Sequence, residues 1–212
     1  GPSIPKIMGI EDEKPTGTNS GINPIITKEG LKVISLGFML PERDSPVVWR
    51  GALKMKAIQQ FLGDVNWGDL DYLVSDLPPG TGDEPLTIAQ LIPEPDGAVI
   101  VTTPQDVALL TIRRAVNFAK GVGLPILGLI ENMSGFVCPY CGHEVDIFKS
   151  GGGEDLASEL GIPFLGKIPL DPDIVKSGEK GRPFVMKPGS KSAEIFENIV
   201  NKMKKSLSDR KR

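Results

Sequence analysis

The stretch Asp71–Glu84, which reads DYLVSDLPPGTGDE, decides the fold. Its apolar run Tyr72–Leu77 predicts a buried strand, and the Gly/Pro-rich turn Pro78–Asp83 leads into a predicted helix over 84–91. In open parallel sheets, ligands bind beyond the carboxyl ends of the strands. We therefore expect Asp76, at the end of such a strand, to point into a binding site.

A carboxylate in that position suits a Mg²⁺ ion held beside a nucleotide phosphate. The backbone of the following turn can approach a γ-phosphate, and its two glycines allow a change of conformation. The residues that we expect to do so are Pro78, Gly80, Thr81 and Gly82. Asp83 either positions a water molecule or favours the N-terminus of the next helix. We predict Asp76 and Asp83 as catalytic residues; the simpler alternative is a tight turn with a solvated or capping aspartate.

The rest of the chain repeats the pattern of an apolar run followed by a helix. Apolar runs predict strands over 25–26, 31–38, 97–103, 125–131 and 163–167. Helical spacing predicts helices over 47–62, 106–121, 154–160, 172–177 and 192–207. Because the longer strands lack polar alternation, we predict one α/β domain over residues 1–212. Its sheet is twisted and mostly parallel, with helices on both faces.

Composition excludes several classes of protein. The chain has 212 residues and a formal net charge of −3, which argues against a nucleic-acid partner. No apolar run approaches the roughly 18–20 residues that span a bilayer, so we expect no membrane partner. A lone close pair of cysteines, Cys138 and Cys141, indicates metal or redox chemistry in a reducing compartment. We therefore expect a cytoplasmic protein.

The two cysteines lie close enough in sequence to bind one metal centre. Structural zinc sites and cubane clusters take about four protein ligands. One chain has two cysteines and one histidine, His143, which we expect to be a solvated loop residue. Two chains related by a two-fold axis would supply four thiolates, which predicts a homodimer that shares a cluster. A bridging zinc satisfies the same count. A thioredoxin-like redox pair is a weaker alternative, because that motif should open a helix near the chain start.

Five stretches together resemble the Mrp/ApbC group of iron–sulfur cluster carrier ATPases, which belongs to the MinD/ParA-like P-loop NTPases. They follow one another in the family's order over nearly the whole chain. The stretches are Gly1–Pro5 (GPSIP), Val48–Gly51 (VWRG), Asp76–Glu84 (DLPPGTGDE), Ile130–Ser134 (IENMS) and Cys138–Gly142 (CPYCG).

This resemblance implies a P-loop NTPase fold, ATP with Mg²⁺ as a cofactor, and slow ATP hydrolysis. It implies that Asn132, at a strand end, recognises adenine and that Pro169, in the stretch Lys167–Asp171 (KIPLD), flanks the base. It also implies that Cys138 and Cys141 hold a [4Fe–4S] cluster that bridges two chains. The cluster would come from an iron–sulfur scaffold and pass to apo-protein recipients.

The phosphate-binding loop of that family, of the type Gly-Lys-Gly-Gly-x-Gly-Lys-Ser/Thr, is not in the sequence. The glycine run Ser150–Gly153 lacks the Lys-Ser/Thr ending and does not follow a strand. We expect the loop, with the first strand–helix–strand of the sheet, upstream of Gly1 in a longer parent, and this chain alone to be inactive as an ATPase. The alternative function is a MinD/ParA-like positioning switch, with a membrane or DNA partner and a structural zinc at the cysteines.

Overall fold

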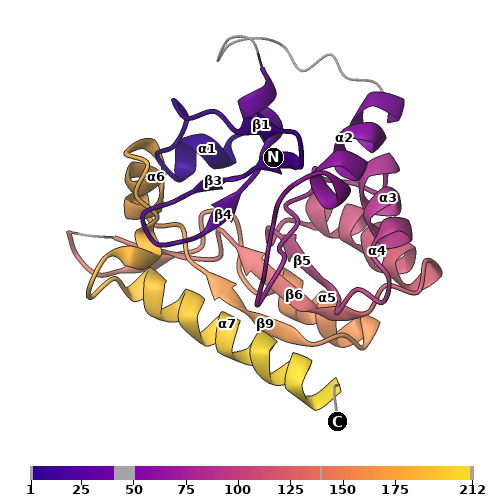
Figure 1. The fold of residues 1–212 in the computed structure, drawn as a ribbon. Coiled ribbons are helices and arrows are strands. Elements are labelled where there is room, and N and C mark those ends of the chain that lie inside the picture. Colours follow the sequence, from indigo (N-terminus) through magenta and orange to yellow (C-terminus); the bar gives the residue numbers. More distant parts are fainter. Residues whose placement is uncertain (1, 41–50, 139, 211–212) are drawn as a thin grey trace. The chain divides into compact units, whose positions relative to one another are not determined.

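The computed structural model describes residues 2–40, 51–138 and 140–210 (Figure 1). The contacts of the chain divide it into two compact units. The N-terminal unit consists of Gly1–Ile92 and Ser177–Pro183, and the C-terminal unit consists of Pro93–Lys176 and Phe184–Arg212. The single domain over residues 1–212 stays a prediction.

A three-stranded parallel sheet in the order β5–β6–β9 forms the centre of the C-terminal unit. β5 spans Ala98–Thr102, β6 spans Ile126–Asn132 and β9 spans Phe164–Ile168. The middle strand β6 is buried over all of its residues except the last, because it has a neighbour on each side and helices above and below. These strands confirm three of the predicted apolar runs.

Helices cover both faces of this sheet, as predicted. They are α4 (Asp106–Gly121), α5 (Gly152–Leu160) and α7 (Lys191–Arg210). Leu129 of β6 packs against Leu156 of α5, whereas its neighbour Ile130 packs against Ile199 of α7, which runs beside β9 in Figure 1. Successive side chains of a strand point to opposite faces, so β6 joins both layers of the core. Burial of each such apolar side chain stabilises the folded state by about 1.5–3 kcal/mol.

The N-terminal unit is built from short elements. These are α1 (Ile4–Ile7), β1 (Thr16–Thr18), β2 (Gly21–Asn23), β3 (Ile25–Ile26), β4 (Lys32–Val33), a 3₁₀ turn η1 (Leu36–Met39), α2 (Gly51–Gly63) and α3 (Asp83–Leu91). The strands of this unit form two antiparallel pairs, β1–β2 and β3–β4. A small core holds the unit together and contains Ile10, Ile25, Val33 and Phe38. The predicted helix over 47–62 is confirmed from Gly51; its first four residues lie outside the described residues.

Two predicted strands of this unit are wrong in whole or in part. Only Lys32–Val33 of the run 31–38 forms a strand, because the Ser35 side chain accepts a hydrogen bond from Gly37 N at 3.1 Å and starts η1 instead. The run 72–77 forms no strand among the described residues, and Val74 is 87% exposed. Its apolar pattern marks a segment that would be stable as a strand only between hydrogen-bonded neighbours.

The remaining elements of the chain are α6 (Pro172–Glu179), the 3₁₀ turn η2 (Phe184–Met186) and a small hairpin, β7 (Phe136–Val137) with β8 (Glu144–Val145). Phe184 of η2 packs edge-to-face on Phe196 of α7, with ring centroids 5.3 Å apart. Among the described residues, no helix combines the length and the apolar character needed to cross a membrane.

Candidate functional site

The predicted phosphate-sensing turn lies in the N-terminal unit, immediately before α3. Asp76 and the residues Pro78, Gly80, Thr81 and Gly82 are exposed to solvent. Gly80 has φ +109°, a backbone conformation that favours glycine. Gly82 is extended and forms the N-cap of α3 without a side-chain cap. The turn therefore presents its backbone to solvent, as a phosphate-sensing segment requires.

Asp83 and Glu84 begin α3, where the helix dipole favours acidic side chains. The Thr87 hydroxyl donates to the Asp83 carbonyl oxygen at 2.6 Å, which tightens the first turn. Lys54 of α2 lies 2.7 Å from the Glu84 carboxylate, and this hydrogen bond lowers the pKa of Glu84. Glu84 thus links α3 to α2, and the helix-start alternative for Asp83 fits its position equally well.

Asn132 and Pro169 lie at the carboxyl ends of the adjacent strands β6 and β9. Asn132 is the register partner of Ile168, the residue before Pro169. The two predicted adenine contacts are therefore side by side in the C-terminal unit. Asn132 also lines a hollow of about 350 Å³ together with Thr102 and Thr103 at the end of β5. The Oδ1 atom of Asn132 accepts a hydrogen bond from Met133 N at 2.9 Å, so the side chain also stabilises the turn that follows.

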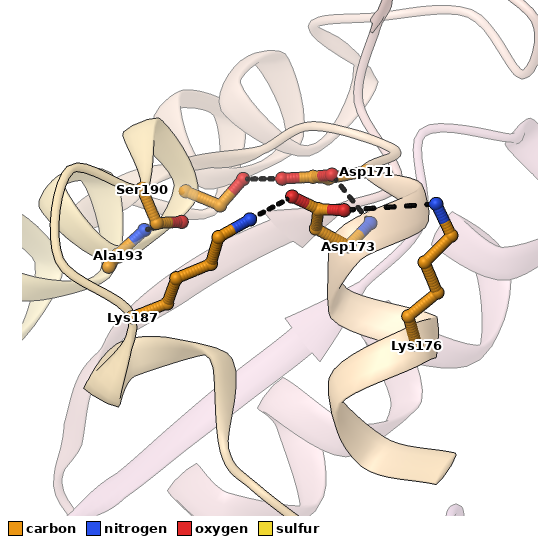
Figure 2. Close-up of polar contacts among 7 residues, drawn as sticks. Asp171, Asp173, Lys176, Lys187, Ser190 and Ala193 are labelled. Carbon is orange, nitrogen blue, oxygen red and sulfur yellow. Dashed lines mark hydrogen bonds and ion pairs between the residues drawn. The ribbon is translucent and has the colours of Figure 1, made fainter. Parts of the chain in front are cut away.

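The segment after Pro169 is anchored by Asp171 (Figure 2). One oxygen of its carboxylate accepts from Asp173 N at 2.8 Å, at the start of α6, and the other accepts from the Ser192 hydroxyl at 2.5 Å. Lys187 and Lys176 approach Asp173 from opposite sides, at 2.5 and 4.0 Å. The Asp173 carboxylate raises the pKa of Lys187. These contacts fix the loop that carries Pro169 to α6 and α7.

The cysteines lie at the tip of the β7–β8 hairpin. Cys138 N donates to the His143 carbonyl and Gly142 N donates to the Cys138 carbonyl, both at 2.9 Å, while Gly142 has φ +69°. Within this tight turn, the backbone N–H groups of Cys141 and Tyr140 act on the Cys138 thiol. They lower the pKa of the Cys138 thiol, Cys141 more than Tyr140. Backbone donors around a sulfur favour the thiolate, which is the form that binds metals.

Both cysteines are free thiols, and Cys141 is exposed. Within the described ranges, no cluster of three or more His, Cys, Asp or Glu side chains is placed to hold a metal ion. His143 is exposed, in line with the expected solvated loop residue.

Sequence reasoning missed Glu131, the residue before Asn132. It is 0% exposed, and its carboxylate accepts hydrogen bonds from the Ser134 hydroxyl, from Gly151 N at 2.8 Å and from Gly153 N. The run 150–153, which the sequence analysis rejected as the phosphate-binding loop, lies at the N-terminus of α5. Its backbone binds the Glu131 carboxylate. The available signal was an acidic residue at the end of a buried strand together with a glycine run before a helix.

The predicted site residues fall into two groups. Asp76 and the turn 78–83 belong to the N-terminal unit, whereas Asn132, Pro169, Cys138 and Cys141 belong to the C-terminal unit. Within the C-terminal unit, one loop joins the adenine candidates to the cysteines. We call residues 133–150 the cysteine loop; its base lies at Glu131 and its tip at Cys138 and Cys141.

Known proteins resemble this chain over most of its length. The family model described as ParA, NUBPL iron-transfer P-loop NTPase, matches residues 1–204. The iron-sulfur cluster carrier protein of Methanocaldococcus jannaschii is 51% identical over 211 residues, which are 100% of this chain and 72% of the relative.

Two solved structures show the same fold. The nucleotide-binding protein of Archaeoglobus fulgidus, solved in complex with ADP and with Co found, matches with TM-score 0.71 and 40% identity, over 86% of this chain and 70% of that one. The cell division protein MinD of Aquifex aeolicus matches with TM-score 0.60 and 17% identity, over 96% and 80%. The predicted α/β P-loop NTPase fold is therefore confirmed. The chain belongs to the ParA family, in the group of NUBPL iron-transfer P-loop NTPases.

Proposed function

We propose that this chain is the cluster-holding part of an ATP-dependent iron–sulfur cluster carrier. Its cargo is a [4Fe–4S] cluster that Cys138 and Cys141 bind and then release to an apo-protein. The observation that carries the proposal is that two free thiols, Cys138 and Cys141, lie together at the tip of one hairpin, where Cys138 N donates to the His143 carbonyl and Gly142 N donates to the Cys138 carbonyl. A tip that stabilises thiolate yet remains open to solvent suits a cluster that must be both held and handed on.

The proposed carrier is a homodimer in which each chain supplies two thiolates. The hairpin carries a group of exposed apolar side chains: Val137 at 45%, Tyr140 at 97%, Val145 at 45% and Ile147 at 51% exposure. Apolar side chains gathered around a metal-binding tip are typical of a surface that another protein covers. A second copy of this chain fits best, because it brings the two further thiolates that a cubane cluster takes.

We propose nucleotide-binding roles for residues of each unit. We assign Asp76 to Mg²⁺, the turn Pro78–Gly82 to the γ-phosphate and Asp83 to the attacking water. Asn132 and Pro169 would flank the adenine, which is supported by ADP in the A. fulgidus relative and by the adjacency of the two strand ends. ATP binding supplies the free energy that biases the dimer. We propose that hydrolysis is slow and that it requires a phosphate-binding loop in addition to the residues of this chain.

The partners of the carrier would be an iron–sulfur scaffold that donates the cluster and apo-proteins that receive it. The M. jannaschii relative is named as a cluster carrier. Two free thiols that must stay reduced suit the cytoplasm. Neither a nucleic acid nor a membrane is part of the proposal.

Anaerobic reconstitution with iron and sulfide tests the cluster. We expect a broad sulfur-to-iron charge-transfer band, with iron and sulfide in equal amounts, and loss of both in Cys138→Ala. His143→Ala is the matched control from the same hairpin and should bind the cluster as the unchanged chain does. A chain that binds zinc tightly and takes up no iron or sulfide would overturn the carrier and favour the positioning switch with a structural zinc.

A second experiment tests the nucleotide assignment. Calorimetry with ATP and Mg²⁺ should detect no tight binding to this chain, and binding should appear in a chain that includes a phosphate-binding loop. In that longer chain, Asp76→Asn should remove hydrolysis with a smaller effect on binding. Tight ATP binding by this chain alone would contradict our expectation that a further loop is required.

A further inference from the structure

Glu131 is a buried charged residue to which the proposed function gives no role. Burying a carboxylate costs several kcal/mol unless donors replace the water that it loses. Three donors do so here: the Ser134 hydroxyl, Gly151 N and Gly153 N. Lys167 of the neighbouring strand adds positive charge nearby, since Glu131 is one of the carboxylates that raise its pKa, after Glu154.

These donors come from the two opposite ends of the cysteine loop. Ser134 lies at its start, whereas Gly151 and Gly153 follow its end. The Ser134 and Ser150 hydroxyls are also 3.0 Å apart, which closes the base directly. Hydrogen bonds to the Glu131 carboxylate thus hold the two ends of the cysteine loop together. The tip of this loop carries both cysteines.

Backbone contacts hold the same base against the sheet. Ser134 N donates to the Ile168 carbonyl at 2.9 Å, and Leu170 N donates to the Gly135 carbonyl at 2.8 Å. Close packing leaves no space for a side chain at the other end, because a Cβ on Gly153 would lie 2.9 Å from Glu131 Oε2 and one on Gly152 would lie 2.6 Å from the Pro104 carbonyl oxygen. The glycines therefore let the start of α5 approach Glu131.

We propose that Glu131 is a positioning residue that fixes both ends of the cysteine loop to the strand end carrying Asn132, and thereby sets how firmly Cys138 and Cys141 hold their cargo. The effect on the cluster rests on the proposed carrier function, whereas the fixing of the loop does not. The geometry also joins the adenine candidate to the cysteines, since Asn132 is adjacent to Glu131 in the chain.

The test compares Glu131→Gln with Glu159→Gln. Glutamine keeps the volume of Glu131 but turns an N–H group toward a backbone N–H. Glu159 is on the exposed side of α5, paired with Arg113, and provides the same substitution without a buried partner. Circular dichroism should give the same secondary structure for both variants. If Glu131→Gln does not fold, Ser134→Ala takes its place in the test, because it removes the hydroxyl that contacts both Glu131 and Ser150.

Hydrogen exchange in the metal-free chain measures directly how firmly the cysteine loop is held. We expect amides of residues 133–153 to exchange about tenfold to a hundredfold faster in Glu131→Gln, since an unpaired buried hydrogen-bonding group strongly disfavours the closed state. Exchange in β5 and α7 should not change, nor should any segment of Glu159→Gln. Unchanged exchange over 133–153 would overturn the proposal, whatever the cargo is.

The rate of cluster release measures the effect of the loop on the bound cluster. After reconstitution, a chelator should remove iron about tenfold faster from Glu131→Gln than from the unchanged chain. The reason is that a less firmly held loop positions the two thiolates less well for binding the cluster. The charge-transfer spectrum should also shift, which a purely structural cap would not cause. Faster exchange with unchanged release and spectrum would refute positioning of the cargo. If the unchanged chain takes up no cluster, the carrier function fails, while hydrogen exchange still decides the role in the loop.

Discussion

The base and the tip of the cysteine loop differ in nearly every physical property. At the base, Glu131 is 0% exposed and its carboxylate has donors from both ends of the loop. At the tip, Tyr140 is 97% exposed and Cys138 and Cys141 are free thiols. We propose that the base contributes stability and that the tip contributes binding chemistry. The cysteine loop of eighteen residues therefore combines a fixed base with an exposed tip. A carrier needs both in order to exchange its cargo.

The comparison predicts that stability is most sensitive to packing at the base. Gly153→Ala should lower the free energy of unfolding by about 1–3 kcal/mol, because its new methyl group would overlap the Glu131 carboxylate. Gly121→Ala, at the end of α4 with nothing within 4 Å of the added Cβ, is the matched control and should leave stability unchanged or slightly higher. Urea unfolding followed by circular dichroism measures both. Equal midpoints for the two variants would contradict a closely packed base.

A smaller loss is expected when one hydroxyl group is removed at the base. Ser134→Ala should cost about 1–2 kcal/mol, because it leaves one oxygen of a buried carboxylate with fewer donors. Ser208→Ala removes a hydroxyl on exposed α7 that donates to the Lys204 carbonyl at 3.0 Å, and it should cost less than about 0.5 kcal/mol. A loss no larger than that of the control would mean that Glu131 does not depend on Ser134.

Lys167 provides a weaker, pH-dependent contribution next to the base. Its ammonium lies 2.8 Å from the Glu154 carboxylate, which is the main cause of its raised pKa. A raised pKa in the folded chain gives stability that is complete below the unfolded value, about 10.4, and is lost as pH rises through the folded value. From neutral pH upward, the Tm difference between the unchanged chain and Lys167→Gln should therefore shrink only in alkaline buffer. A difference that instead shrinks toward neutral pH would show that another group is responsible.

The smallest effect on folding is expected at the tip. Tyr140→Ala should leave the unfolding midpoint unchanged, because the side chain is almost fully exposed. It should nevertheless weaken association of the cluster-loaded chain, which sedimentation at several protein concentrations measures. A large loss of stability with unchanged association would reverse the roles that we assign to the two ends of the loop.

The C-terminal unit could be predicted closely from the sequence. β5, β6, α4 and α5 follow from local runs and spacings, because a buried parallel strand is apolar throughout and an amphipathic helix repeats its pattern every turn. The cysteine pair can be read in the sequence, and residue types alone predict metal or redox chemistry there, whereas the cluster was predicted through family resemblance. Asn132 and Pro169 were predicted through family resemblance, and the adjacency of β6 and β9 now brings them together.

What could not be predicted depends on contacts distant in sequence. Glu131 meets donors 20 and 22 residues further on, so no local pattern reveals them. The run 72–77 has the composition of a buried strand, yet composition does not supply the neighbours that a strand needs. Local hydrogen bonding also overrides composition at Ser35, whose side chain turns a predicted strand into η1.

The central claim is that the tip of the cysteine loop carries a cluster shared by two chains, and native mass spectrometry of the anaerobically reconstituted chain tests it most directly. The account predicts a species with the mass of two chains and one [4Fe–4S] cluster, which separates into single chains when the cluster is removed. A cluster bound by a single chain, or a dimer that contains zinc and no sulfide, would contradict it.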